Sequence, residues 1–233
     1  MRPRTLDHVA LWLADRDTVA DFATRHLGMH VIERTERFTL VGSHARHGKL
    51  TLFAADPPRE RGALEHIALK VSSLAEAKKS LPDGLVTTSL HGGELLFDVG
   101  EGLRLGLVEA ATTVEYDLDH VALRSRSPVE TAEEYLRLGF ERAEVGASGR
   151  PRVSVGGAFV EFVQGDPGRP EQPLLNHLAV LVDSTEEHIA GAGELGIEID
   201  DVVDAPNTYA LFVWGPERVR VEYVEHKASF SLT

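Results

Sequence analysis

The chain repeats one short phrase four times, and each copy places a histidine near the start of an apolar run. The copies occupy Asp7–Leu11 (DHVAL), Glu65–Leu69 (EHIAL), Asp119–Leu123 (DHVAL) and Asn176–Val180 (NHLAV). Their histidines, His8, His66, His120 and His177, are separated by 58, 54 and 57 residues. Self-similarity at so regular a period indicates repeated structural units. The sequence therefore predicts four copies of one module.

The internal pattern of each copy predicts a strand, a helix and three further strands. The phrase itself alternates small or polar with apolar residues and is rich in Val, Leu and Ile, which favours a strand with one face toward a core. Residues suited to the N-cap follow at Asp15, Ser73, Ser127 and Ser184, and glycines suited to helix ends at Gly28, Gly139 and Gly196. The remainder consists of short β-rich runs, best seen at 140–145, 152–155 and 158–163. Each module is thus expected to be βαβββ.

Composition narrows the classes of function. The chain has 233 residues, 42% of them hydrophobic, no cysteine and a formal net charge of −13. Without thiolates, any metal must be held by nitrogen and oxygen, and no oxidising compartment is needed. The negative charge disfavours nucleic acid and anionic membrane surfaces, and no apolar run reaches the length of a membrane span. We expect a cytoplasmic protein whose partner is a small-molecule substrate, with homo-oligomerisation left open.

Two carboxylates within apolar strands indicate that the second half of the chain holds the functional site. The strand-like segment 219–225 closely matches 103–109, and Glu222 stands where the earlier segment has Gly106. In the same way Glu161 falls opposite Thr51. A carboxylate within an apolar strand is costly to bury unless it is paired or bound to a cation. The sequence therefore predicts a divalent metal site among four residues of the second half: His120, Glu161, His177 and Glu222.

With these motifs in view, the chain resembles the vicinal oxygen chelate superfamily, which includes glyoxalase I, extradiol dioxygenases, fosfomycin-resistance enzymes and bleomycin-binding proteins. The resemblance implies an α+β fold of four tandem βαβββ modules forming two paired, cupped mixed β-sheets, with helices packed outside. It divides the chain into an N-terminal domain, 1–112, with modules 5–56 and 63–110, and a C-terminal domain, 113–233, with modules 116–165 and 174–226. On this interpretation the first domain is a degenerate scaffold, in which His8 and His66 are relics of duplication, and the second holds the metal.

The resemblance implies two alternative activities and one non-catalytic role. An extradiol-type ring-cleaving dioxygenase acting on a catecholic substrate, favoured here, would hold Fe(II) with His120, His177 and Glu222 and use Glu161 as a base. A glyoxalase-I-like lyase or isomerase would use Glu161 as a fourth ligand, with Ni, Co, Zn or Mn also possible. A small-molecule binding or resistance protein is the third possibility. The segment 212–222 is similar to the family's closing motif, but Phe212 replaces its tyrosine, so Tyr209 is the nearby candidate for that role.

Further residues are candidates for substrate contact. Arg124 and Arg220 share strand faces with His120 and Glu222, so either could meet an anionic substrate or form a salt bridge. Phe212, Trp214 and Tyr209 could wall an aromatic pocket or belong to the core. The remaining histidines near strand ends or turns, His44, His47, His91 and His226, are expected to be solvated.

Overall fold

The structure, a computed structural model, describes residues 1–90, 92–146 and 148–233, and it contains the four expected modules. His91 therefore lies outside the described residues. Module one comprises β1 (Thr5–Leu13), α1 (Arg16–His26), β2 (His30–Arg34), β3 (Phe38–His44) and β4 (His47–Ala54). Module two comprises β5 (Leu64–Val71), α2 (Leu74–Ser80), β6 (Thr87–Ser89), β7 (Leu95–Asp98) and β8 (Arg104–Glu109). Module three comprises β9 (Asp117–Ser125), α3 (Pro128–Arg137), β10 (Glu141–Arg142), β11 (Arg152–Val155) and β12 (Ala158–Gln164). Module four comprises β13 (Leu175–Leu181), α4 (Thr185–Leu195), β14 (Ile199–Asp204), β15 (Thr208–Trp214) and β16 (Arg220–His226), with a short 3-10 turn at Pro216–Arg218.

The four helices begin at the predicted caps. The side chains of Asp15, Ser73 and Ser184 each accept a hydrogen bond from the backbone N–H three residues later, which satisfies a donor that the first helical turn leaves free. Helix α3 starts after Ser127 with Pro128 in its first turn. At the end of α4, Gly196 adopts a left-handed conformation that favours glycine. Local sequence therefore determines where these helices begin and end.

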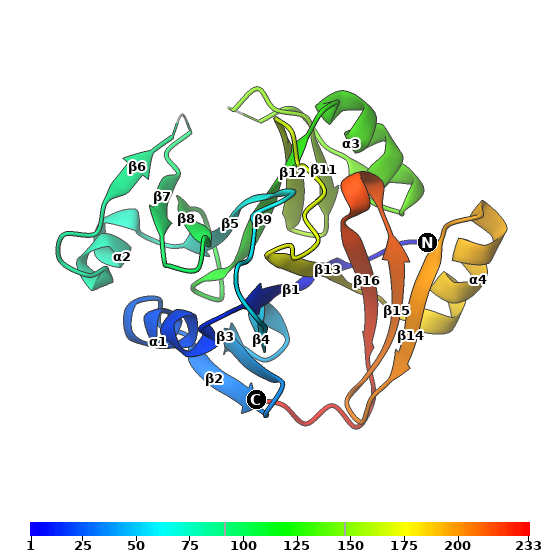
Figure 1. Cartoon of the computed structure of the whole chain (residues 1–233), viewed down its shortest axis with the longest axis horizontal. Helices are drawn as coiled ribbons and strands as arrows, with labels where there is room; N and C mark the ends of the chain where they lie inside the picture. The colour runs from blue at the N-terminus through cyan, green and yellow to red at the C-terminus, as the bar shows by residue number, and fades with distance from the viewer. Residues whose placement is uncertain (91, 147) are drawn as a thin grey trace.

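The strands form two eight-stranded mixed sheets, and each sheet combines two modules that are not the expected pair. The outer-module sheet, built from modules one and four, has the order β14-β15-β16-β13-β1-β4-β3-β2. The inner-module sheet, built from modules two and three, has the order β10-β11-β12-β9-β5-β8-β7-β6. Figure 1 shows the first and last modules, blue and orange-red, on one side of the molecule. The modules that share a sheet are therefore one with four and two with three, rather than neighbours in the chain, and the division into domains 1–112 and 113–233 stays a prediction.

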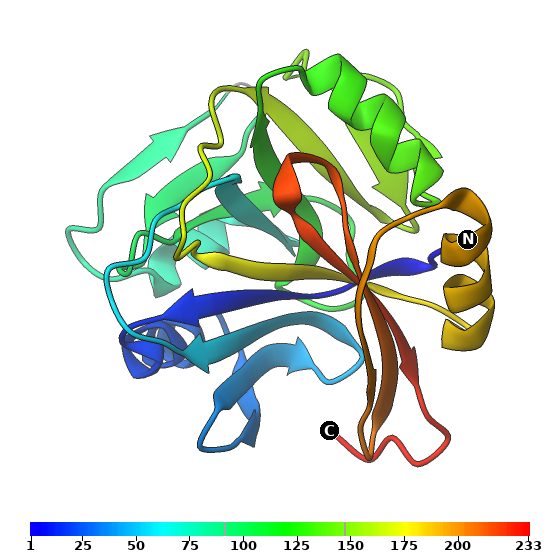
Figure 2. The same ribbon diagram turned by 45° about the vertical axis from the view of Figure 1, so that its right-hand side comes forward.

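The centre of each sheet is an antiparallel pair of the histidine-bearing strands. In the outer-module sheet β1 pairs with β13, and Figure 2 shows these strands running side by side through the molecule. In the inner-module sheet β5 pairs with β9. On both flanks the first strand of a module pairs in parallel with its last strand, as β1 does with β4 and β13 with β16. The first and last strands of two modules therefore lie next to one another at the middle of each sheet.

Two linkers carry the chain between the sheets, and they run alongside each other. The segment 55–63 leads from module one to module two, and 165–174 leads from module three to module four. Glu60 bridges to Pro173, and its backbone N–H and C=O pair with Gln172 and Leu174 at 3.1 and 2.6 Å. The linker between modules two and three, in contrast, remains within the inner-module sheet. Because the chain crosses between the sheets twice, module four joins the same sheet as module one.

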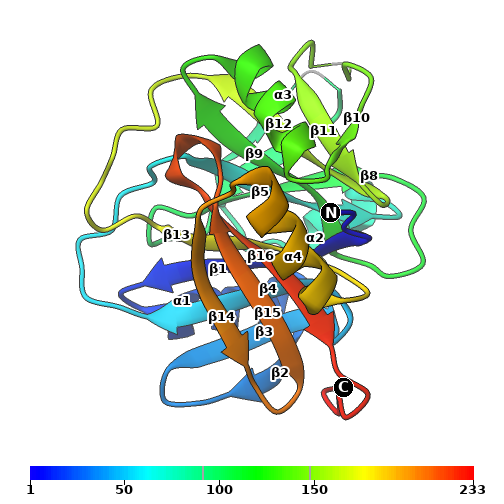
Figure 3. The ribbon, with the colours of Figure 1, turned by 90° about the vertical axis from the view of Figure 1, so that its right-hand side faces the viewer.

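One large hydrophobic core joins the two sheets and the inner faces of the helices. Val9, Leu11 and Val121, which alternate away from the histidines, are fully buried in it. Figure 3 shows α4 lying across β15 and β16, against which it packs. Tyr223 on β16 is also completely buried, and its hydroxyl donates to the carbonyl of Leu138 at 2.7 Å. The opposite face of each sheet carries the repeated histidines. Within the described residues, no helix is long and apolar enough to cross a membrane.

Candidate metal centre

A β-bulge precedes each of the four repeated histidines. Where β1 pairs with β13, Leu6 faces Val180 and His8 faces Ala179, so that Asp7 has no partner of its own. The same irregularity leaves one extra residue in each of the other phrases, at Glu65, Asp119 and Asn176. A bulge bends the strand and re-aims side chains that strict alternation would send to opposite faces. It allows the residue before each histidine to reach that histidine's own ring.

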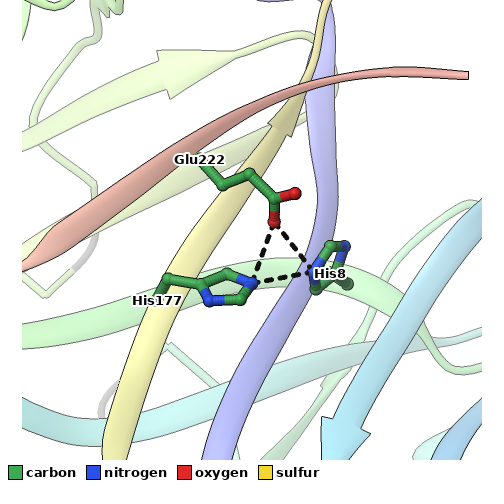
Figure 4. A group of neighbouring side chains, drawn as sticks. All are labelled: His8, His177 and Glu222. Carbon is green, nitrogen blue, oxygen red and sulfur yellow. Dashed lines mark hydrogen bonds and ion pairs between the residues drawn. The ribbon is translucent and has the colours of Figure 1, made fainter. Parts of the chain in front are cut away.

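The bulges bring together His8, His177 and Glu222 on the concave face of the outer-module sheet. The Nε2 atoms of His8 and His177 lie 3.0 Å apart. Glu222 Oε2 lies 3.1 Å from His8 Nε2 and 2.9 Å from His177 Nε2. Figure 4 shows the two rings and the carboxylate pointing toward a common centre from β1, β13 and β16. We call this group the outer triad.

The bulged residues determine which ring nitrogens of the outer triad can bind a cation. Asp7 Oδ2 lies 2.7 Å from His8 Nδ1, and Asn176 Oδ1 lies 2.9 Å from His177 Nδ1. Because a carboxylate or amide oxygen only accepts, each Nδ1 is assigned as the N–H donor. Each Nε2 of the neutral ring then presents a lone pair. Such a second partner commonly orients and strengthens a metal-binding histidine.

In the absence of a metal, a bound proton offsets the negative charge at the outer triad. Burial would lower the pKa of His8, but the negative charges of Glu222 and Asp7 outweigh it and raise that pKa to about 9. Burial would likewise raise the pKa of Glu222, yet the neighbouring His177 and His8 hold it well below its usual range. Burial lowers the pKa of His177, against the opposing effect of Glu222. The group therefore attracts one positive charge, held on His8 in the absence of metal.

The spacing of the donor atoms fits a divalent metal. Donors at roughly 2.1 Å from a metal and at right angles to each other would lie about 3.0 Å apart, whereas tetrahedral donors would lie about 3.4 Å apart. The three observed separations, 2.9, 3.0 and 3.1 Å, match the right-angled case. Among the described residues, none donates a well-directed hydrogen bond to the buried Oε2 of Glu222. Two imidazoles and one carboxylate arranged on one face suit Fe(II), Mn, Co, Ni or Zn.

A second group lies at the related place in the inner-module sheet. His66 Nε2 is 3.2 Å from His120 Nε2 and 2.9 Å from Glu94 Oε1, and His120 Nε2 is 3.7 Å from the same oxygen. Asp119 Oδ2 accepts from His120 Nδ1 at 2.8 Å, as Asp7 does from His8. We call this group the inner triad. Both triads are combinations of two histidines and one glutamate that could hold a metal ion.

The structure distributes the four predicted ligands differently from the expectation. His177 and Glu222 come together, but their third partner is His8, and His120 lies in the inner triad with His66. Glu161 belongs to neither triad among the described residues, since its carboxylate accepts from Arg150 Nη1 and Ser148 Oγ, both at 2.7 Å. The cause is the pairing of modules one with four and two with three. The first half therefore contributes to both groups rather than serving only as scaffold.

Sequence reasoning passed over His8, His66 and Glu94. The two histidines carried the same repeated phrase as His120 and His177, so the signal for them was present. They were set aside because Thr51 and Gly106 stand in the first half where the second half has carboxylates. Glu94 had no repeat partner to identify it, and only its position just before β7 brings it to the inner triad.

Of the candidate substrate residues, Phe212 lies closest to the outer triad. Its ring is 5.2 Å from the ring of His177, and Phe53 is 6.4 Å from the same ring on another side. Arg220 stacks over Phe212 at 4.0 Å, while its Nε donates to Asp200 at 2.6 Å. The indole N–H of Trp214 also donates to Asp200, at 2.9 Å. Phe212, Arg220 and Trp214 thus lie on the face of the triad.

Tyr209 and Arg124 lie apart from the outer triad. Tyr209 alternates to the helix side of β15, where its hydroxyl donates to Glu186 at 3.0 Å. Arg124 is on the inner-module sheet and binds Glu65 at 2.5 Å. This salt bridge is the alternative that the sequence left open for an arginine at that position.

His226 is not solvated as expected, but belongs to a buried ionic cluster behind the outer triad. Its Nε2 lies 3.0 Å from Asp7 Oδ1, and Lys49 Nζ donates to the same carboxylate at 2.9 Å. Phe230 from the C-terminal segment stacks on the ring of His226 at 4.2 Å. Asp7 therefore links His8 to two further polar side chains, and the C-terminal segment covers this end of the concave face. His44 and His47, at a turn, are exposed as expected.

The other end of the concave face opens into a cavity of about 530 Å³. Its walls include Trp12, Trp214 and Arg220, and also Asn176, the residue that holds His177. Trp12 and Phe53 pack at 5.1 Å and continue the aromatic surface from the cavity to the triad. A cavity of this size, lined by aromatic side chains together with charged residues such as Asp200, Arg218 and Arg220, is large enough for a small molecule.

The chain is similar to one family model and to several solved structures. Residues 5–83 match the family model of the Glyoxalase/Bleomycin resistance protein/Dioxygenase superfamily. No curated protein matches the chain in sequence. A solved structure from Bacillus subtilis, described as a "putative dioxygenase", aligns with 98% of this chain and 87% of its own, with a TM-score of 0.81 and 18% identity.

Two further solved structures share the fold. Glyoxalase I from Zea mays aligns with 95% of this chain and 92% of its own, with a TM-score of 0.73 and 14% identity. The cppA protein from Streptococcus pneumoniae aligns with 96% of this chain and 98% of its own, with a TM-score of 0.62 and 14% identity. At these identities the likeness is one of fold, and it extends over nearly the whole chain.

Proposed function

Because residues 5–83 match the model of the Glyoxalase/Bleomycin resistance protein/Dioxygenase superfamily and the whole chain shares the fold of a "putative dioxygenase", we propose that it is a metal-dependent enzyme acting on a small molecule, with extradiol-type ring cleavage of a catechol as its reaction. His8, His177 and Glu222 would hold Fe(II). The observation that carries the proposal is the mutual spacing of their donor atoms, 2.9 to 3.1 Å, with which three protein ligands would hold the metal and substrate oxygens could take its remaining positions.

The position of Thr51 supports the dioxygenase over the lyase. Thr51 faces Ala10 on the neighbouring strand, just as Glu161 faces Ala122 in the inner-module sheet. A hydroxyl group therefore stands where a fourth, carboxylate ligand would stand. A lyase or isomerase of this class needs a carboxylate to move a proton between carbon atoms, and Glu222 is the only one in the outer triad. Three protein ligands leave room for two vicinal oxygens and for dioxygen.

Fe(II) bound there would act as a Lewis acid toward the two hydroxyl oxygens and offer a position for dioxygen. The chain's own residues would select and orient the substrate. Phe212 and Phe53 flank His177 with aromatic rings, against which a planar catechol can stack. The cavity beyond Trp12 and Trp214 would admit the ring substituents. Arg220, fixed by Asp200, supplies a polar group at the rim.

The test is metal analysis of anaerobically purified protein, followed by oxygen uptake with a panel of catechols after loading with Fe(II). We expect one Fe(II) at the outer triad and consumption of one dioxygen per catechol cleaved. Full loading with no uptake on any catechol, or activity only with Ni, Co or Zn and no response to oxygen, would favour the lyase and overturn the proposal.

A matched pair of variants in one strand assigns the activity to the triad. Glu222→Gln removes the charged ligand, and we expect loss of both iron at this site and turnover. Glu225→Gln, on the other face of β16, removes a carboxylate that accepts from the backbone N–H of Thr185 at 2.9 Å. That variant should keep both iron and turnover. Equal activity of the two variants would place the chemistry elsewhere.

A further inference from the structure

We propose that His66, His120 and Glu94 form a second divalent transition-metal site, independent of the outer triad, in which a carboxylate from the segment before β7 replaces one that β8 lacks. The inner triad lies in the other sheet, and none of its residues takes part in the proposed reaction.

Gly106 is the structural counterpart of Glu222. In the outer-module sheet Glu222 faces Ala179, two residues beyond His177, and in the inner-module sheet Gly106 faces Ala68, two residues beyond His66. A Cβ placed on Gly106 would lie 2.3 Å from Glu94 Oε1. The carboxylate of Glu94 therefore fills the space that a side chain at position 106 would enter. Glu94 reaches the histidines from the segment just before β7, whereas Glu222 reaches its histidines from β16, the last strand of its module.

The three donors are buried without an adequate partner other than one another. His66, His120 and Glu94 are 1%, 4% and 8% exposed. Glu94 Oε1 receives no well-directed hydrogen bond within the described part of the chain, although two ring nitrogens lie within 3.7 Å. A buried carboxylate oxygen without a donor is costly, and a cation bound to all three groups removes that cost. Two imidazoles with one carboxylate favour Zn, Co, Ni, Fe or Mn over Mg or Ca.

The inner site should bind metal more weakly than the outer one. Asp119 orients His120, but the corresponding residue beside His66 is Glu65, whose carboxylate is bound by Arg124 and Arg104. His66 Nδ1 consequently has no hydrogen-bond partner among the residues described. Loss of such an orienting partner commonly lowers metal affinity 10- to 100-fold. A cavity of about 280 Å³, lined by His66, Leu96 and Arg104, gives the site a route to solvent.

The test counts metal in chelator-treated protein reloaded with Co²⁺ or Zn²⁺. We expect two equivalents for the unmodified chain, with affinities that differ, one for Glu94→Ala, one for Glu222→Gln, and none for the double variant. Because Glu222→Gln removes the outer site alone, failure of the proposed function and failure of this inference give different results. Two equivalents in Glu94→Ala, or a single equivalent in the unmodified chain, would overturn the inference.

A double variant that moves the carboxylate from position 94 to position 106 tests whether Glu94 acts as a metal ligand or only as a structural residue. In Glu94→Ala with Gly106→Glu, the carboxylate moves to the position that Glu222 occupies in the other sheet. The backbone of Gly106 does not have a positive φ, and the Glu94→Ala change removes the carboxylate that a Cβ would meet at 2.3 Å. The remaining close atom, Leu96 Cδ2 at 3.0 Å, is the end of a flexible side chain that can shift. We expect the second equivalent of metal to return. If the relocated variant stays at one equivalent while its outer site is filled, the two positions do not supply one site and the inference is wrong.

Discussion

His8 and His177 are 169 residues apart in the chain, and their Nε2 atoms lie 3.0 Å apart. Each belongs to the first strand of its module, and these two strands pair at the centre of the outer-module sheet. Asp7 and Asn176 hold the far nitrogens of the two rings, and Glu222 closes the group. A metal site formed in this way joins the first module to the last, so loading it should be sensitive to changes at either end of the chain.

Replacement of the first-module histidine tests this relationship directly. His8→Ala should lose the metal of the outer triad, because two donors remain where three converge. Metal content measured after reloading should fall by one equivalent, with turnover abolished. His47→Ala, an exposed histidine of the same module, is the control and should change neither. Retention of metal and turnover in His8→Ala would exclude His8 as a ligand.

Asn176, which orients His177, should affect the metal affinity of the outer triad without itself binding the metal. Asn176→Ala removes the acceptor for His177 Nδ1–H at 2.9 Å, and we expect affinity for the metal to fall roughly 10- to 100-fold. Competition with a chelator of known affinity measures the change. Gln164→Ala removes an exposed amide at the end of β12 and should leave affinity unaltered. A wild-type affinity for Asn176→Ala would show that the bulge residue has no orienting role.

The raised pKa of His8 predicts a pH dependence of the metal-free protein. Since folding raises that pKa from 6.5 to about 9, protonation of His8 contributes stability fully below about pH 6.5, and this contribution is lost as the pH rises through about 9. Chemical denaturation in the presence of a chelator should therefore show the free energy of unfolding declining from pH 6.5 to 9.5. The decline should be absent in His8→Gln. An equal decline in both proteins would assign it to another group.

The buried ionic cluster behind the triad should matter for stability. Lys49→Met leaves the carboxylate of Asp7, which is 1% exposed, without its lysine partner, though His8 and His226 remain beside it. Breaking a buried pair in this way should lower the free energy of unfolding by about 3 kcal/mol. Lys79→Met, which breaks an exposed pair with Glu76, should change it by less than about 0.5 kcal/mol. Denaturant titration of the two variants measures the difference.

Local sequence was sufficient to predict the modules. The four phrases predicted four first strands, and the capping residues Asp15, Ser73 and Ser184 lie where the helices begin. The sequence singled out Glu222 because a carboxylate within an apolar strand is costly to bury unless it is paired or bound to a cation. The sequence also predicted that two histidines and a strand carboxylate would come together, and the structure contains two such groups. The strands and helix starts depend on contacts within one module, where neighbours in sequence are neighbours in space.

The partners across each sheet were decided only by the tertiary structure. Four similar modules can join as one with two and three with four, or as one with four and two with three, and the first strands would form the same kind of antiparallel pair in either case. The parallel linkers around Glu60 and Pro173 accompany the second arrangement. That arrangement joins His8 to His177 and His66 to His120, and brings Glu94 into the space beside Gly106. Repetition in the sequence makes the modules equivalent, so only long-range packing can distinguish between their partners.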